Sequence, residues 1–414
     1  MPTAPEPEPH PLPSLVVAFA LALAAAVSLG LARFSYAVLL PPMRADLGWS
    51  YLTAGAMNTA NAAGYLLGAL ATPAALRRFG ARRVLLGGGV VAGLLLCAHG
   101  AVVADAWLYA LRLLTGVASA ATFVAGGLLA ARLADRPGTG RLADHPGSGA
   151  AAPSAGLLLG IYYGGTGLGI VVSALLVPPL AALPGAHAWQ AAWVALGAVA
   201  LAATALTGLA TRGLEPAAAA RPPRVPVAWR GFAFALVSYF LFGLGYIGYM
   251  TFVVTLLREQ GLGSTAVTAF YTLLGLAVMG SSWLWAGLLQ RHRGGGAMRL
   301  LNALLALATL LPVLSAQPLA VFASGLLFGG VFLSVVASTT AWVRHNLPSS
   351  AWPAGIGAFT TLFAAGQIVG PTLVGWVADG AAGLRGGLAV SAAVLGLAAL
   401  AAWRQKPFEH HSPG

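Results

Sequence analysis

The sequence predicts an all-α integral membrane protein with twelve transmembrane helices, arranged as two six-helix bundles related by pseudo-symmetry. Of its 414 residues, 58% are hydrophobic and only 8% are charged. Its mean hydropathy of +0.83 lies far outside the range of soluble domains. Apolar stretches of roughly 20 residues, the length of helix that crosses a ~30 Å hydrocarbon core, recur along the chain. A weak internal repeat relates its two halves.

Each apolar stretch is expected to form one membrane helix, with short loops between most of them. The predicted spans are 14–40, 51–75, 84–104, 106–131, 154–177, 189–211, 230–257, 264–289, 297–316, 318–343, 352–378 and 385–403.

Two longer connections, 134–153 and 212–229, are rich in Pro, Gly and Ala, which is typical of flexible or extended linkers. The second lies near the middle of the chain and separates six helices from six. The predicted domains are a cytoplasmic tail 1–13, an N-terminal bundle 14–211, a cytoplasmic linker 212–229, a C-terminal bundle 230–404 and a cytoplasmic tail 405–414.

The basic residues are distributed asymmetrically over the loops. With the N-terminus inside, 17 of the 22 Lys and Arg residues fall in cytoplasmic segments and three in outer loops. This bias places both termini in the cytoplasm and argues against nucleic acid as a partner, despite the net charge of +12. The arginine- and alanine-rich composition is typical of a GC-rich bacterial genome, so we expect a multi-pass protein of the bacterial cytoplasmic membrane. The N-terminal segment lacks a basic n-region, so the first helix should be retained.

The internal repeat is clearest in two segments 213 residues apart. "GLARFSYAVLLPPMRADLG" (30–48) and "GLGYIGYMTFVVTLLREQG" (243–261) share glycines at both ends and a tyrosine. Further on, "GTGLG" (165–169) matches "GQIVG" (366–370). Parallel repeats joined by a central linker are a known transporter plan, with the substrate site near the midplane between the halves.

Over essentially its whole length the chain resembles the major facilitator superfamily. "RLLTGVASA" (112–120) is similar to that superfamily's fourth-helix motif, and "GIYYGGTGLG" (160–169) to its glycine-rich fifth-helix motif, although the usual proline is missing. "ARFSYAVLLPPM", "NAAGYLLGAL", "GLGYIGYMTF" and "GQIVGP" resemble the YbfB/YjiJ branch. The resemblance implies the major facilitator fold and secondary transport, but no substrate. One departure is Arg77, which stands where the superfamily usually has Asp, three residues before Gly80.

Two arginines, Arg33 and Arg112, fall inside predicted membrane helices. A buried arginine costs roughly 2.5 to 3.5 kcal/mol at a helix centre. Arg33 is expected ~12 Å and Arg112 ~9 Å from the outer helix ends, so both lie in the outer half of the membrane. Either side chain could instead reach the headgroups or cap carbonyls of a neighbouring helix. We favour a substrate-binding role for Arg33, whereas binding and packing remain equal alternatives for Arg112.

Asn58 and Asn61 lie three residues apart on the second predicted helix and therefore share a face. They are expected ~12 and ~16 Å below the outer surface, at the level of the two arginines. Hydrogen bonding between helices, worth about 0.6 kcal/mol on average, is the alternative to a role in binding.

Other polar and aromatic residues are candidates to line a central cavity, although each taken singly is more often a packing residue. Two adjacent tyrosines, Tyr162 and Tyr163, cannot both point into it. The candidates are Tyr36, Tyr162, Tyr163, Tyr246, Tyr249 and Gln367.

All ten Asp and Glu residues fall in loops, tails or helix ends, so no carboxylate is expected to face Arg33 or Arg112 within the membrane. A transported anion would supply the missing charge, and the planar guanidinium suits a carboxylate. We therefore predict a secondary transporter that moves a small organic anion by alternating access. The alternatives are an exporter of hydrophobic or cationic compounds and, from other classes, a transporter-like sensor or a membrane-embedded enzyme.

No sequence motif indicates nucleotide binding, metal binding or catalysis. "GGTGLG" lacks the strand–turn–helix setting of a nucleotide loop, and neither HExxH nor GxSxG occurs. We expect no enzyme activity, cofactor or metal, and a monomer whose partners are a small-molecule substrate and the lipid bilayer. Without a buried carboxylate, transport would be coupled by co-transport of protons with the substrate, by exchange of substrates, or through His99. For His99, packing is the alternative.

The predicted topology can be tested with Ser148→Cys in a Cys97→Ala background, because Cys97 is the sole cysteine. The loop around Ser148 should be cytoplasmic, so an impermeant thiol reagent should label it in inverted vesicles and not in intact cells. Labelling of intact cells would reverse the orientation.

Overall fold

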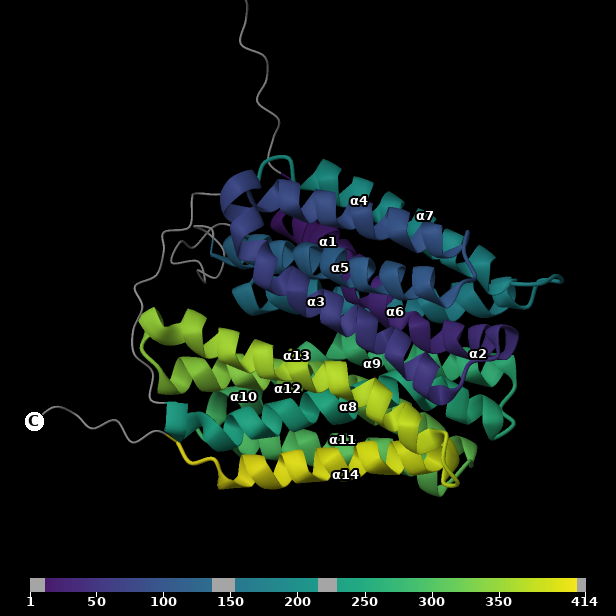
Figure 1. The fold of residues 1–414 in the computed structure, drawn as a ribbon. Helices are drawn as coiled ribbons and strands as arrows, with labels where there is room; N and C mark the ends of the chain where they lie inside the picture. The colour runs from purple at the N-terminus through teal and green to yellow at the C-terminus, as the bar shows by residue number, and fades with distance from the viewer. Residues whose placement is uncertain (1–11, 136–152, 215–228, 408–414) are drawn as a thin grey trace, which may run out of the picture.

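A computed structural model describes residues 12–135, 153–214 and 229–407, and every regular element in these ranges is a helix (Figure 1). Most of the predicted tails and of the two predicted linkers, including Ser148, lie outside the described residues. The elements are α1 (Ser14–Ala25), η1 (Ala26–Phe34), α2 (Tyr36–Leu47), α3 (Tyr51–Phe79), α4 (Ala81–His99), α5 (Asp105–Ala134), α6 (Ala155–Ala181), α7 (Trp189–Ala210), η2 (Trp229–Phe232), α8 (Ala233–Glu259), α9 (Ser264–Leu284), α10 (Ala286–Arg291), α11 (Gly296–Leu314), α12 (Pro318–Asn346), η3 (Ser349–Ala351), α13 (Trp352–Ala378) and α14 (Gly383–Arg404).

Eleven helical segments of the described chain are long and apolar enough to cross a membrane. The chain is therefore a multi-pass membrane protein. α3 falls outside these eleven because polar residues such as Asn58 and Asn61 lower its hydropathy, but its 29 residues extend over ~43 Å.

The first membrane segment is longer than predicted. It runs from Ser14 to Leu47, past the predicted end at residue 40, because the helix continues through Pro41 and Pro42. Membrane helices tolerate proline where neighbouring groups satisfy the freed carbonyls. The segment ends at Gly48, whose φ of 66° is a left-handed conformation that glycine adopts without a Cβ clash.

The middle of this segment, η1, is a nine-residue π-helix. π-helical turns contain an extra residue and often occur at functional sites, because they change the direction in which a side chain points. η1 contains Arg33 in its last turn, which makes it the local structure that positions this side chain.

The helices before and after residues 215–228 occupy different halves of the molecule. Figure 1 shows α1 and α3 to α7 in the upper half and α8 to α14 in the lower half. The halves meet mainly where α3 packs on α13 and α6 on α9, and α2 also packs on α8.

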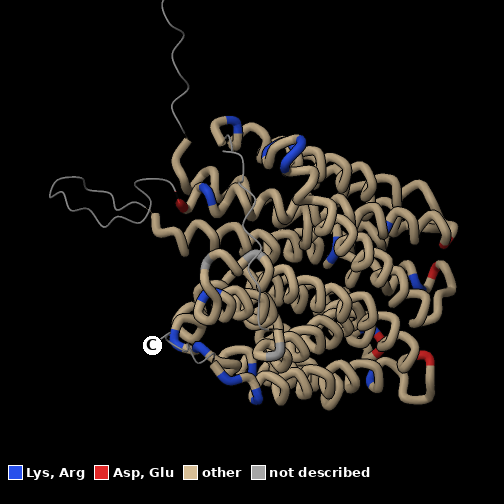
Figure 2. Tube along the Cα trace, turned by 60° about the vertical axis from the view of Figure 1, so that its left-hand side comes forward, with Lys and Arg blue, Asp and Glu red and all other residues tan. Residues whose placement is uncertain are grey.

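Most basic residues lie at one end of the helices and most acidic residues at the other (Figure 2). We call one end the basic end and the other the acidic end. By their places at the helix ends, the described residues of the basic end include Arg77, Arg78, Arg82, Arg83, Arg132, Arg291, Arg293, Arg299, Arg344 and Arg404. The acidic end carries Asp46, Asp105, Glu259 and Asp379.

Glycines allow the helix backbones to touch. A Cβ atom on Gly64 of α3 would overlap the carbonyl oxygen of Leu113 on α5, and one on Gly165 of α6 would overlap that of Ala22 on α1. The second half repeats the latter contact, because a Cβ on Gly366 of α13 would overlap the carbonyl oxygen of Phe240 on α8. Close approach of this kind is the main source of helix association where lipid replaces water.

These contacts predict that Gly64→Ala destabilises the protein by about 1–3 kcal/mol, the usual cost of overpacking. Thermal unfolding of the purified protein should therefore shift to lower temperature. The matched control is Gly396→Ala on α14, where no atom lies within 4 Å of the added Cβ. Equal melting temperatures for the two variants would contradict the packing role of Gly64.

Candidate functional site

Arg33 lies between the two halves of the molecule. Its side chain is only 3% exposed, and its Nη2 donates to Oε1 of Gln367 on α13 at 2.6 Å. The amide nitrogen of Gln367 in turn donates to the hydroxyl of Tyr246 on α8. The guanidinium carbon also lies 5.4 Å from the ring centroid of Tyr65 on α3. A cation from the first half is thus held by neutral groups from both halves.

No carboxylate neutralises this cation within the described residues. An ion pair joins His187 to Asp46 at the acidic end, and Arg33 takes no part in it. Nε of Arg33 is buried and has no hydrogen-bond partner there. Within the described chain, Arg33 is therefore hydrogen-bonded to a neutral group, and part of its donor capacity is unused.

Arg112 on α5 has a different environment. Its Nη1 donates to the carbonyl of Ala32 in η1 at 3.1 Å, and its Nη2 donates to Oδ1 of Asn58 at 3.0 Å. The guanidinium lies 4.6 Å from the ring centroid of Tyr36 and 5.9 Å from that of Trp193. Because Arg112 bonds to the residue that precedes Arg33, it ties α5 to the π-helix and supports the position of Arg33.

The two predicted asparagines extend this polar layer. Asn58 accepts from Arg112 and donates its amide to Oγ1 of Thr251 on α8 at 2.7 Å, which links the two halves a second time. Asn61 donates to the carbonyl of Arg112 at 3.0 Å, and its own carbonyl oxygen is buried without a partner in the described chain. Both asparagines therefore make the interhelical bonds that the sequence left open as an alternative.

Among the predicted tyrosines, Tyr246 belongs to the Arg33 network, and Tyr36 lies under Arg112 with its hydroxyl bonded to the carbonyl of Ala54. Tyr249 is stacked on Phe328 at 4.0 Å within the second half.

The adjacent pair on α6 behaves as the helix geometry predicts. Tyr162 is fully buried, with its hydroxyl bonded to the carbonyl of Phe123, whereas Tyr163 is 39% exposed. Neither is among the hydrogen-bond partners of Arg33 and Gln367.

The internal repeat relates two residues of the central contacts to each other. The offset of 213 aligns Arg33 with Tyr246. The structure brings these repeat-related residues to opposite ends of the same amide, Gln367. The first helices of the two halves therefore contribute equivalent positions to one central site.

Sequence reasoning missed two residues of the site. Tyr65 lies four residues after Asn61, on the same helical face, and this spacing could have identified it. Thr251 carries no such signal, because its hydroxyl becomes relevant only when α8 is placed against α3.

His99 packs on Trp193, whose ring lies beside the guanidinium of Arg112. Its ring stacks on Trp193 at 4.4 Å, its Nδ1 is 2.7 Å from the carbonyl of Leu95, and its side chain is fully buried. These contacts support packing, and a role in coupling stays a prediction.

The comparisons with known proteins agree with this architecture. A family model described as the uncharacterised MFS-type transporter YbfB matches residues 25–403, where MFS denotes the major facilitator superfamily. The chain belongs to this family. Among curated proteins, no relative was found.

Solved structures of other MFS-type transporters share the fold. The nucleoside transporter NupG in its D323A form superposes with a TM-score of 0.69 at 12% identity, covering 94% of this chain and 99% of that one. A bacterial homologue of the human lysosomal transporter Spinster, in an inward-facing and unoccupied conformation, gives 0.67 at 14% identity, covering 97% and 99%. At these identities the likeness shows the fold alone.

In this MFS-type transporter, hydrogen bonds also join the two halves at the acidic end. The carboxylate of Asp379, after α13, accepts from the backbone N–H groups of Tyr51 and Leu52 at 2.8 and 2.9 Å, where α3 begins. The hydroxyl of Tyr51 donates to Glu259 at the end of α8. We call these contacts the acidic-end latch; its carboxylates satisfy N–H groups that a helix N-terminus leaves free.

The backbones of α3 and α13 also approach each other closely near the latch. A Cβ on Gly375 of α13 would overlap the carbonyl oxygen of Tyr51, and one on Gly55 of α3 would overlap that of Pro371. The contact between α3 and α13 at this end is therefore close.

Proposed function

We propose that this protein is a secondary active transporter that moves a small organic anion, such as a carboxylate, and that Arg33 binds the anionic group. The observation that carries the proposal is the buried guanidinium of Arg33, which has neutral partners and an unpaired Nε. A cation in this position lacks charge compensation, and a bound anion would supply it.

The chemistry of the surrounding residues supports this assignment. The guanidinium can offer two parallel N–H donors to a carboxylate. Tyr65, Tyr246 and Gln367 would orient the remainder of the substrate, since they already surround the guanidinium. Arg112 would position Arg33 through Ala32, in place of the direct binding role that the sequence left open.

The proposed mechanism is alternating access by two six-helix bundles, 14–211 and 230–404, that rock about the central site. The acidic-end latch and the close contact of α3 with α13 support a state closed at the acidic end. The inward-facing conformation of the Spinster homologue, which has the same fold, is consistent with such a state.

The proposed orientation places the basic end in the cytoplasm of a bacterial cell, because positively charged loops are retained on that side. The acidic-end latch would then face the periplasm. In this arrangement both termini, the connection 134–153 and the linker 212–229 would be cytoplasmic.

Export of cationic compounds fits the site less well. A cation-binding cavity needs a negative or electron-rich partner, and the described centre presents two arginines. Neutral nucleosides remain useful comparison ligands, because one structural neighbour is a nucleoside transporter.

A panel of carboxylates, organic cations and nucleosides, screened by thermal shift, should reveal stabilisation by an anion, because a ligand that binds only the folded state raises its stability. Arg33→Lys keeps the charge but loses the fork, so affinity for that anion should fall roughly tenfold or more. Arg33→Gln and Arg33→Ala should bind still more weakly. Binding constants at matched expression test the series.

The control for this series is Arg112→Lys, because a lysine cannot reproduce the two divergent bonds to Ala32 and Asn58. Its melting temperature should fall further than its ligand affinity. Equal ligand affinities for the wild type and all three Arg33 variants would sink the anion-site assignment, as would stabilisation by nucleosides or cations alone.

The state assignment predicts that Asp379→Asn favours opening at the acidic end, because an amide cannot accept from both N–H groups with a full negative charge. Spin labels on Ala45→Cys and Ala381→Cys, in a Cys97→Ala background, would lie on exposed residues of opposite halves. The distance between the labels should be short when the acidic end is closed and long when it is open. In Asp379→Asn the population with the long distance should increase several-fold.

Asp135→Asn provides the control, since Asp135 is an exposed acid at the basic end. This variant should leave the distance distribution unchanged. An unchanged distribution for Asp379→Asn would show that the latch does not hold the halves together.

A further inference from the structure

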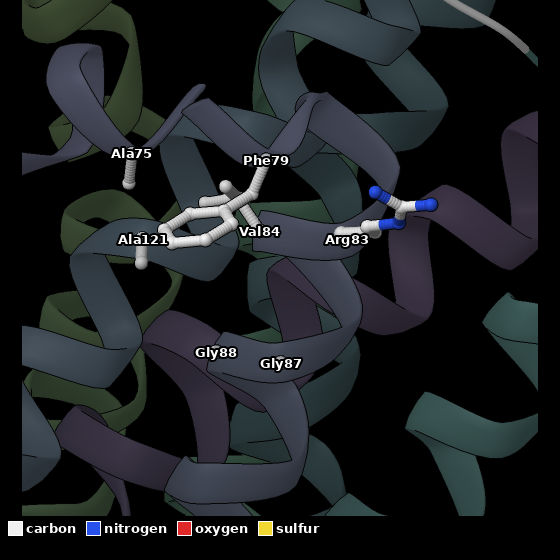
Figure 3. A pocket seen from close by; sticks show the side chains of 7 residues that line it. All are labelled: Ala75, Phe79, Arg83, Val84, Gly87, Gly88 and Ala121. Carbon is white, nitrogen blue, oxygen red and sulfur yellow. The ribbon is translucent and has the colours of Figure 1, made fainter. Parts of the chain in front are cut away.

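A continuous apolar groove runs over the outside of the first half, away from the Arg33 site. It consists of two adjoining hollows of about 370 and 270 Å³. They share Gly87 and Gly88 of α4 and Ala121 of α5, so they form one groove. Figure 3 shows the first hollow, with the Phe79 ring at one wall and the glycines opposite.

The length of the groove matches one leaflet of a bilayer. It follows α4 from Arg83 to Leu95, which are 12 residues or ~18 Å apart along a helix. Half of a ~30 Å hydrocarbon core is ~15 Å. A chain that enters beside Arg83 would therefore reach the middle of the membrane near Leu95.

The groove is lined by large apolar side chains that are exposed on the surface. Phe79, Val91 and Leu114 line it and are 51%, 48% and 48% exposed. Large apolar side chains exposed on a membrane-spanning surface contact acyl chains. The absence of a side chain on Gly87 leaves open space on α4, because no atom lies within 4 Å of a Cβ added there.

The charge at the two ends of the groove differs. Its basic end carries Arg83, whose guanidinium points away from the Phe79 ring (Figure 3). Arg82 on the next position is committed to the carbonyl of Gly208 through Nη2. Arg77 and Arg78, in the last turn of α3, add positive charge beside Phe79. The other end, at Leu95 and Leu114, is apolar.

We infer that this groove is a binding site for a phospholipid with an anionic headgroup, from the leaflet at the basic end. One acyl chain lies along α4 over Gly87 and Gly88, and the phosphate lies beside Arg83. Apolar burial supplies affinity for the chain, and the arginines select negative headgroups, since basic residues near a membrane surface attract anionic lipid.

Lipid binding can be measured by native mass spectrometry of the full chain in detergent, with phosphatidylglycerol or phosphatidylcholine carrying identical acyl chains. Wild-type protein should retain phosphatidylglycerol in preference. Gly87→Leu should reduce its occupancy at least fivefold, because the side chain fills the groove. The variant should fold, since no atom lies within 4 Å of a Cβ at Gly87.

The matched control is Gly396→Leu on α14, where an added Cβ also meets no atom within 4 Å and the groove is distant. It should keep wild-type occupancy. Arg83→Gln should abolish the preference for phosphatidylglycerol while some binding of both lipids remains, and Arg404→Gln, at the basic end of α14, should preserve the preference.

Three results would overturn the assignment. They are wild-type phosphatidylglycerol occupancy in Gly87→Leu, equal retention of the two lipids by the wild type, and a wild-type dimer that Gly87→Leu dissociates, which would make the groove a contact between copies. None of these measurements depends on the transported substrate, so the proposed function and the lipid site fail independently.

Discussion

The constraint on which the site depends is the burial of a guanidinium among groups that carry no negative charge. Arg33 must direct its N–H donors to neutral acceptors, and Gln367 provides the acceptor from the opposite half at 2.6 Å. This requirement explains the layer around it. The π-helix η1 positions Arg33, Arg112 holds η1 through Ala32, and Asn58 holds Arg112 while bonding to α8. Each polar group of this layer therefore provides a hydrogen-bond partner for the next one.

Close backbone packing makes this polar layer possible. Hydrogen bonds between membrane helices are individually weak, so they cannot by themselves hold helices that lipid would otherwise separate. Contacts such as that of Gly64 with Leu113 bring α3 and α5 near enough for Asn61 to reach the carbonyl of Arg112. The glycines at these close helix contacts thus also determine the geometry of the candidate site.

The sequence predicted the helical membrane class and most helix positions, because apolar length and charge asymmetry are local properties. It also identified Arg33, since an arginine in an apolar run is conspicuous. It could not predict the π-helix, which has no local signature here, or the continuation of the helix past Pro41. Gln367 was a candidate by composition, but its partners come from α8 and η1, which only the packing of the halves brings together.

In the proposed mechanism, one hydrogen bond would connect substrate binding to movement. Gln367 joins Arg33 of the first half to Tyr246 of the second, and these two residues are related by the internal repeat. An anion that takes the donors of Arg33 competes with Gln367 for the same guanidinium. Binding would then weaken a contact between the halves at the centre, while the acidic-end latch still joins them at one end. By linkage, the factor by which a bound anion would weaken the central contact equals the factor by which formation of that contact would weaken binding of the anion.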